Sequence, residues 1–595
     1  MSVTSRATGA PGATVRGLLQ RLPPPLDAAA VVALLRRNKY PLLSLDPATL
    51  PEGLAGAPAF QRALAEERAF WASQREEYLQ VREAWAQRGI PCLFIKTACI
   101  PPSFPYTSDN LDILVHREQG EEAKAVLREL GYLELRNVEE RCKFLFRKFR
   151  DGRSVSAVHL HYWVGWNINF FEEEALWEGA RVAPDDPAVL APSPEDALLI
   201  NLAHAFYENK RFTLHDLEKV RVNWERHELE WEALAEVPRR RGWHDGLLLG
   251  LLLTAHLEEA LTGATEVPEG WRRRWDEELR RYPHAHRYLR RLLERPVTMP
   301  FRVGFLFSKL LYYQKIWRDT HDSLPAKAAT TARTLVWGFK LKSGIRPNRG
   351  MLVAFSGLDG SGKTLQAQAL ARVLKTCDIA HSSYWSRVGC SPFTRLVSRV
   401  VQRRSTRGKG PAPDWGGPRE NLSRWPGFVQ AAWAWLMVLD LAVRYTLRVR
   451  LPLWRGRLGL GKVVVCDRYA LDAAAEVLAR ASGGGWAVRL AVAFLRVASP
   501  RPTQAYLLDV PEPVAQARHA LPISTQRLAE YRRWYLSLGP AFGARVEDGQ
   551  RGAGELGDET AARVVREFQA RYPTWLNGLL LSNPRQLNPK GPAQR

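Results

Sequence analysis

The feature that most constrains the fold is a glycine-rich turn between an apolar run and a helix-forming run. Residues 357–364 read Gly-Leu-Asp-Gly-Ser-Gly-Lys-Thr and fit the pattern GxxxxGK[ST] at every fixed position. MLVAFS precedes the turn and LQAQALARVLK follows it, so the expected order is strand, loop and helix. Backbone N–H groups of such a loop can surround a phosphate, and the helix N-terminus adds partial positive charge. The pattern predicts a nucleotide site.

Each polar position of this loop has a chemical role in that interpretation. Lys363 is expected to reach the β- and γ-phosphates of ATP, and Thr364 to bind Mg²⁺ through its hydroxyl. The expected nucleotide-binding residues are Gly357, Asp359, Gly360, Ser361, Gly362, Lys363 and Thr364. The alternative is a glycine-rich turn without a ligand, which the flanking strand and helix disfavour.

Apolar runs of strand length at 351–356, 462–466 and 505–508 predict a parallel sheet with helices on both faces. The second run ends in Asp467-Arg468-Tyr469. An acidic residue at the carboxyl end of such a strand lies where an open α/β sheet binds its ligand, so Asp467 can hold Mg²⁺. Arg468 can pair bidentately with an acceptor phosphate. The alternative is a buried strand with surface ion pairs at its end.

Three motifs in order, FSGLDGSGKT, VVVCDRY and LLDVPEPVAQAR, resemble thymidylate kinase over about residues 350–575. The resemblance implies a P-loop fold of the nucleoside monophosphate kinase type. It implies direct phosphoryl transfer from ATP, which relies on positioning and charge neutralisation. The catalytic residues implied in this sequence are Lys363, Asp467, Arg468 and Arg518.

The resemblance also implies a substrate site and an arginine-bearing lid. Arg518 would belong to the lid, with Arg527 and Arg532 as further candidates, and lid closure would exclude water. The expected substrate-binding residues are Arg387, Arg468, Tyr469 and Asp472.

The sequence departs from the thymidylate kinase pattern around the substrate. Ser356 stands where the family has glutamate, and residues 384–389 (YWSRVG) replace its REPGG-like segment. Residues 470–476 (ALDAAAE) replace the residues that follow DRY in the family. The acceptor is therefore expected to be a nucleoside monophosphate or another phosphorylated small molecule, and the sequence does not name it.

The first half of the chain alternates strands and helices before becoming mainly helical. Strands are expected at 91–95, 110–115, 143–149 and 156–161, and a helix at 70–88. The segments CLFIK, TSDNLDILV and VHLH resemble the large uncharacterised bacterial branch of the nucleotidyltransferase fold, over roughly residues 30–270. The PEDALL run at 194–199, with His204 and Asp216, fits the helical half of that branch.

Active members of that branch carry an Asp-x-Asp pair on one strand face and a third acid on a neighbouring strand. Here Asn110 and His159 occupy two of these positions, and only Asp112 remains. Loss of two hard carboxylates should weaken Mg²⁺ binding severely, so weakened or absent catalysis is expected. The alternative is a second metal site built from Asp112, Asn110, His159 and Lys96, or a softer site that includes His161.

The amino-acid composition limits the kinds of partner and the cellular location that are expected for this protein. The 595 residues hold 85 Lys and Arg against 62 Asp and Glu, a formal net charge of +23 that attracts polyanions. No compact basic block with interleaved aromatics predicts a nucleic-acid groove. Six scattered cysteines form no disulfide pattern, so a cytoplasmic location is expected. No apolar run approaches the ~20 residues of a membrane span.

The expected organisation has five parts: a disordered N-terminus (1–27), a nucleotidyltransferase-like α+β domain (28–295), a basic helical linker (296–349), a thymidylate kinase-like α/β domain (350–578) and a disordered tail (579–595). The linker is expected to be solvated; the alternative is peripheral contact with an anionic membrane. The leading interpretation is a kinase with a weakened first domain. The alternatives are a bifunctional nucleotidyltransferase and kinase, or a nucleotide-binding regulatory scaffold.

Overall fold

A computed structural model divides the chain into two compact units: Met1–Lys148 with Val155–Gly338, and Phe149–Ser154 with Phe339–Arg595. The structure describes residues 12–23, 26–46, 50–51, 53–95, 110–135, 142–166, 168–183, 186–343, 349–389, 391, 426–455, 461–481, 485–519 and 524–571. The predicted tail at 579–595 and residue Lys96 lie outside this part of the chain.

The first unit contains a seven-stranded sheet with the order β3-β4-β5-β2-β1-β7-β6. β2 pairs in parallel with β5, and β1 in parallel with β7, whereas β1 and β2 are antiparallel. The strands are β1 (Leu93–Phe94), β2 (Leu111–Leu114), β3 (Leu133–Leu135), β4 (Lys143–Arg150), β5 (Arg153–His161), β6 (Arg181–Ala183) and β7 (Asp186–Ala191). The four strands predicted in this region are confirmed.

Alternation along β2 and β5 sorts their side chains onto two faces. Leu111 and Ile113 of β2 pack in a core with Val158 and Leu160 of β5, and with the helices α3 (Pro58–Gln87) and α4 (Gly120–Glu129). Residues of the opposite parity, Asp112 among them, therefore project from the other face of the sheet. The fold thus places Asp112 of β2 and its neighbour His159 of β5 on the face away from α3 and α4.

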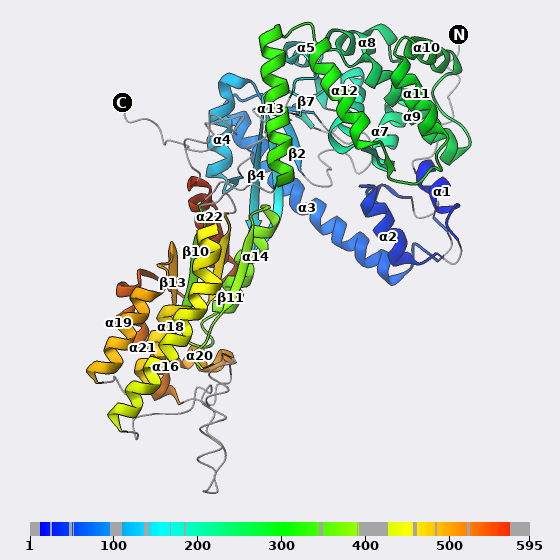
Figure 1. Ribbon diagram of the computed structural model, residues 1–595. Coiled ribbons are helices and arrows are strands. Elements are labelled where there is room, and N and C mark those ends of the chain that lie inside the picture. The colour runs from blue at the N-terminus through cyan, green and yellow to red at the C-terminus, as the bar shows by residue number, and fades with distance from the viewer. Residues whose placement is uncertain are drawn as a thin grey trace. The chain divides into compact units, whose positions relative to one another are not determined.

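Apart from a two-stranded sheet of β8 (Arg211–Phe212) and β9 (Phe301–Arg302), the rest of this unit is mainly helical. Helices α7, α9, α10, α11 and α12 gather in one bundle (Figure 1). The helices are α1 (Ala13–Leu19), α2 (Ala28–Arg37), α5 (Glu173–Glu178), α6 (Pro194–Ala203), α7 (Leu214–Arg226), α8 (Trp231–Arg240), α9 (His244–Thr262), α10 (Glu269–Leu279), α11 (Pro283–Leu293) and α12 (Phe305–Arg318). The predicted PEDALL run and the predicted Asp216 lie at the starts of two of these helices. Ser193 accepts a hydrogen bond from Asp196 N at the start of α6, and Thr213 and Asp216 form a capping box on α7.

Two segments differ from the sequence prediction because they contribute to this core. Residues 13–19, expected to be disordered, form α1, and its Val15 is buried in the bundle. Residues 305–318, expected in the linker, form α12, and Leu311 and Ile316 are buried in the same core. In both cases apolar residues recur at helical spacing, and tertiary packing decides that they are buried.

The second unit contains a five-stranded sheet in which each pair of neighbours is parallel, in the order β11-β12-β10-β13-β14. Its strands are β10 (Met351–Gly357), β11 (His381–Trp385), β12 (Val463–Asp467), β13 (Gln504–Asp509) and β14 (Ala544–Asp548). The three strands predicted for this sheet are confirmed. Parallel strands place their carboxyl ends at one edge, which brings together the polar residues that follow β10 and β12.

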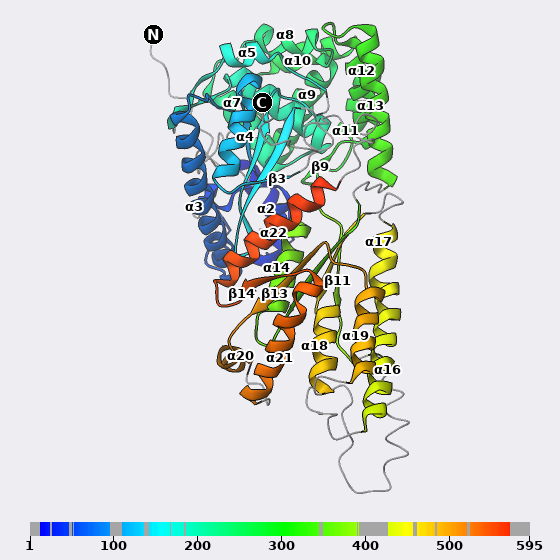
Figure 2. The same cartoon turned by 90° about the vertical axis from the view of Figure 1, so that its left-hand side faces the viewer.

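Helices cover both faces of this sheet, as predicted. α14 (Lys363–Thr376) and α22 (Ala553–Ala570) lie on one side, and α16 (Gly427–Tyr445), α18 (Ala470–Arg480) and α19 (Trp486–Ala498) on the other (Figure 2). The sequence predicts no membrane span, yet the helical stretch Gly427–Arg455 is long and apolar enough for one by length and composition. One face of this stretch, with Trp433, Met437 and Leu441, is buried in a core shared with α18 and α19.

Candidate functional sites

The glycine-rich loop connects β10 to α14 in the predicted order. Gly357, Gly360 and Gly362 have φ values of 142°, 85° and 94°, a region that side chains with a Cβ rarely adopt. A Cβ on Gly360 would lie 2.4 Å from the carbonyl oxygen of Ala515. Glycine is therefore required both by the conformation and by the close approach of another backbone.

Lys363 is the first residue of α14, and only 4% of it is exposed. Its Nζ donates hydrogen bonds to the carbonyl oxygens of Gly357, at 2.9 Å, and Leu358, at 2.5 Å. Burial lowers the pKa of Lys363, while the nearby carboxylates of Asp472 and Asp467 oppose this change. The ammonium group is thus held inside the curve of the loop, where it can neutralise an anion.

Asp467 at the end of β12 faces the first turn of α14. The hydroxyl of Thr364 donates to its Oδ2 at 2.7 Å. The other oxygen, Oδ1, is buried and accepts no hydrogen bond from the residues that the structure describes. Burial raises the pKa of Asp467, since the charged form loses hydration. A hydroxyl beside an unpaired carboxylate oxygen is a set of hard oxygen donors, which fits Mg²⁺.

Asp472, predicted to bind substrate, lies beneath the loop and is 4% exposed. Its carboxylate accepts hydrogen bonds from Ser356 Oγ at 2.6 Å, Tyr469 N at 2.9 Å and Tyr535 Oη at 2.9 Å. Ser356, the residue that departs from the thymidylate kinase pattern, is thus a partner of Asp472. This carboxylate links β10 and α18 to α21 (Thr525–Leu538) and so supports the loop from below.

Tyr469 is turned away from the loop. Its hydroxyl donates to the carbonyl oxygen of Pro500 at 2.9 Å, and its ring packs against Tyr445 with centroids 4.5 Å apart. These contacts place the side chain in the core between strands and helices.

A small cavity of about 40 Å³ opens beside the loop. It is lined by the predicted residues Asp359, Arg387 and Arg468, together with Leu358, Glu476, Leu528, Tyr531 and Tyr535. Arg468 hydrogen-bonds Asp359 and has φ of 70°, which is rare for a residue with a side chain and concentrates at functional sites. Glu476 was not predicted as a site residue, although it follows Asp472 by one helical turn on α18.

The predicted lid arginines are engaged elsewhere in this structure. Arg518 on α20 (Glu512–His519) donates to the carbonyl oxygen of Gly549 at 2.9 Å. Arg532 forms a bidentate ion pair with Asp509, through hydrogen bonds of 2.7 and 2.8 Å. Neither side chain lines the small cavity, and neither does Arg527.

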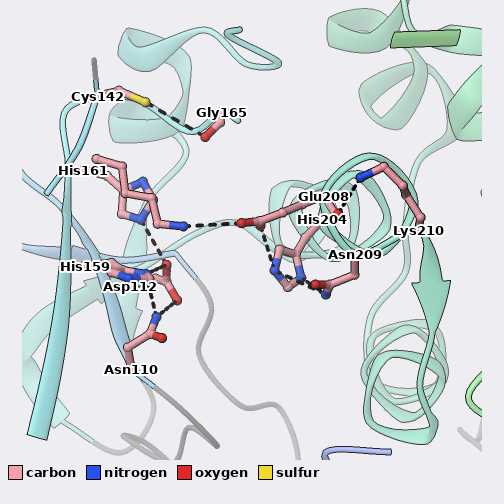
Figure 3. A network of polar contacts seen from close by, with 11 residues as sticks. Asn110, Asp112, Cys142, His159, His161, Gly165, His204, Glu208, Asn209 and Lys210 are labelled. Atoms are coloured by element: carbon pink, nitrogen blue, oxygen red, sulfur yellow. Dashed lines mark hydrogen bonds and ion pairs between the residues drawn. The ribbon is translucent and has the colours of Figure 1, made fainter. Parts of the chain in front are cut away.

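In the first unit, β2 and β5 bring a polar cluster together (Figure 3). The cluster lies on the face of the sheet opposite α3 and α4. Nε2 of His161 lies 3.0 Å from Oδ1 of Asp112, and Nδ1 of His159 lies 3.3 Å from the same oxygen. The amide of Asn110 contacts Oδ2 of Asp112 at 3.0 Å and Nδ1 of His159 at 2.7 Å. The structure thus brings Asn110, Asp112, His159 and His161 together, and Lys96 lies outside the described residues.

The side chains of this cluster suit one cation softer than Mg²⁺, rather than two Mg²⁺ ions. Ligand atoms of Asp112, His159 and His161 lie within 4.8 Å of one another. Burial and the nearby charge of Lys143 lower the pKa of His159 to about 3, so its imidazole is neutral near pH 7. Nδ1 of His159 carries a lone pair when it accepts a hydrogen bond from the amide of Asn110. This nitrogen and Oδ1 of Asp112 are then adjacent electron-pair donors, as two ligands of one ion are. Two nitrogens and one carboxylate favour a softer ion than Mg²⁺.

Glu208, which the sequence analysis did not single out, joins Lys143 to His204. It lies on the helical turn His204–Asn209, 3.4 Å from Lys143 Nζ and 2.9 Å from His204 Nε2 (Figure 3). The carboxylate thereby moderates the positive charge that Lys143 presents to His159. Only the spacing of four between His204 and Glu208 hinted at this pairing.

Comparison with known proteins finds two partial similarities. Residues 27–258 match a family described as "Uncharacterised nucleotidyltransferase". A "Probable thymidylate kinase" of Pyrococcus horikoshii is 28% identical over 164 residues, which cover 27% of this chain and 66% of that protein. Another of the same description, from Pyrococcus abyssi, is 31% identical over 171 residues, with the same coverage. The match thus spans slightly less than two thirds of these relatives.

Proposed function

We propose that the second unit transfers a phosphoryl group from ATP to a phosphorylated small-molecule acceptor, such as a nucleoside monophosphate. The observation that carries this proposal is the meeting of Lys363, Thr364 and Asp467 at the loop between β10 and α14. A buried cation and a hard-oxygen pair at one loop are what binding of a triphosphate with Mg²⁺ requires. The partial similarity to thymidylate kinases supports the same reaction class.

In this mechanism the chain positions the two substrates and neutralises the charge of the phosphates. No side chain forms a covalent bond with the transferred group. Backbone N–H groups of the loop would hold the phosphates, and Lys363 would exchange its contacts with loop carbonyls for phosphate oxygens. Thr364 and Asp467 would hold Mg²⁺, and the bound ion would neutralise negative charge on the transferred group. Arg468 and Arg387, which line the cavity beside the loop, would grip the acceptor phosphate.

For the first unit we propose a nucleotidyltransferase-like domain with weakened catalysis. The observation behind this is that Asn110 and His159 surround Asp112 at positions where active relatives carry acids. The similarity of residues 27–258 to the nucleotidyltransferase family supports the fold assignment. A cytoplasmic location is proposed on the cysteine pattern alone.

The test is phosphoryl transfer from radiolabelled ATP to a panel of nucleoside monophosphates and sugar phosphates. The intact protein should label at least one acceptor, and Lys363→Ala should abolish labelling while thermal unfolding shows an intact fold. Arg372→Ala, on the exposed side of α14, is the matched control and should label normally. Equal labelling by the intact protein and Lys363→Ala would overturn the proposal.

A further inference from the structure

A second concave site lies in the first unit, and no residue of the Asp112 cluster lines it. Its volume is about 710 Å³, within the range of ~300–1,000 Å³ that is typical of small-molecule sites. Residues of α2, α3 and a two-stranded ribbon of β8 (Arg211–Phe212) and β9 (Phe301–Arg302) form its walls. The cationic residues on these walls are Arg36, Arg37, Lys39, Arg211 and Arg302.

The ribbon places two of these arginines directly opposite each other. In the antiparallel register Arg211 pairs with Arg302, and Phe212 pairs with Phe301. Phe212 and Phe301 are 0% and 3% exposed in the core, so alternation turns both arginines to the other side, where they line the cavity. Like charges directly opposite on paired strands are destabilising. An anion between the two guanidinium groups would remove this cost.

The acidic residues on the cavity wall do not neutralise the pair. Glu66 bonds Arg36 at 2.9 Å, and Glu67 accepts the backbone N–H of Leu43 at 3.0 Å. Among the described residues, no carboxylate lies within ion-pair distance of Arg211 or Arg302. Arg36 and Arg37 lie in the last turn of α2, where the negative end of the helix dipole stabilises their positive charge.

We propose that this cavity binds a phosphate-bearing polyanion of nucleotide size, with its phosphates between Arg211, Arg302 and Arg37. The planar fork of arginine matches phosphate oxygens bidentately, and three such forks converge on one cavity. The rings of Tyr40 and Phe70, which also line the cavity, offer an apolar wall to the rest of the ligand. This site is separate from the phosphoryl-transfer site proposed in the second unit.

The experiment measures binding of inorganic tripolyphosphate to the full chain by calorimetry. All proteins carry Lys363→Ala, which weakens binding at the glycine-rich loop. Arg211→Gln with Arg302→Gln should lower affinity about tenfold for each arginine removed. The matched control is Arg287→Gln with Arg291→Gln on exposed positions of α11, which makes the same change in net charge and should leave affinity unchanged.

Thermal unfolding separates a lost site from a damaged fold. Without ligand, Arg211→Gln should raise the Tm, because it removes the like-charge pair. Arg302→Lys keeps the charge and should retain part of the affinity, which distinguishes a phosphate contact from a packing role. Equal affinities of the two double variants, or the absence of saturable binding when both arginines are intact, would overturn the proposal.

Discussion

The hydroxyl of Thr364 donates to Oδ2 of Asp467 across 2.7 Å, although the two residues are 103 positions apart in the chain. One belongs to the first turn of α14 and the other ends β12, next to β10 in the sheet. The free oxygen of Asp467 is buried beside this contact. The sheet order thus creates a two-residue oxygen site from distant segments.

Asp467→Asn should reduce phosphoryl transfer by about 100-fold or more, because an amide is a poorer Mg²⁺ ligand than a carboxylate. The reaction rate measured against Mg²⁺ concentration should show a raised Mg²⁺ requirement. Thr364→Ser keeps the hydroxyl and should change that requirement little. An unaltered Mg²⁺ curve for Asp467→Asn would remove Asp467 from the metal site.

Arg468→Lys should raise the KM for the acceptor about tenfold and the KM for ATP much less. Lysine keeps the charge but loses the planar fork that fits a phosphate. Steady-state kinetics with each substrate varied in turn provide the measurement. If both KM values rise equally, Arg468 does not bind the acceptor.

Asp472→Ala should destabilise the second unit by about 3 kcal/mol, because it strands the buried donors of Ser356, Tyr469 and Tyr535. Calorimetric unfolding measures the loss. Tyr535→Phe is the control, since it removes one donor and leaves the carboxylate paired, and it should cost about 1 kcal/mol. A loss no greater than that of Tyr535→Phe would contradict this supporting role.

Acid should destabilise the first unit through His159. Its folded-state pKa of about 3 lies below the ordinary value of 6.5, so the unfolded chain binds more protons between these values. The contribution of His159 is complete above pH 6.5 and is lost as pH falls toward 3, by about 2 kcal/mol between pH 7 and pH 5. Unfolding of EDTA-treated protein should show a smaller pH slope for His159→Gln than for the unchanged chain. Equal slopes would contradict the low pKa.

Asn110→Asp with His159→Asp should strengthen Mg²⁺-dependent nucleotidyl transfer, if these two substitutions weaken the first unit. Alternation along β2 places residues 110 and 112 on one face, so the variant would present three carboxylates to Mg²⁺. Transfer from labelled nucleotides is measured with and without Asp112→Ala. Strong transfer by the unchanged protein that depends on Asp112 would show that Asn110 and His159 already serve as ligands.

The sequence by itself determined the local chemistry. The glycine-rich segment that ends in Lys363 and Thr364 predicts a loop between a strand and a helix, because the pattern spans only eight consecutive residues, 357–364. Strands β10, β12 and β13 were predictable because their apolar runs match strand length. Asp112 and His159 were predictable as neighbours only through resemblance, since nothing local pairs β2 with β5.

Tertiary structure alone decided which polar residues face a ligand and which support the fold. Arg468 and Asp472 are only four residues apart in the sequence. The carboxylate of Asp472 accepts hydrogen bonds from three buried donors, whereas Arg468 lines a cavity. The opposed Arg211 and Arg302 lie 91 positions apart, and only the ribbon register makes their charges meet. Burial and cross-strand distance depend on the whole chain, so a linear pattern carries neither.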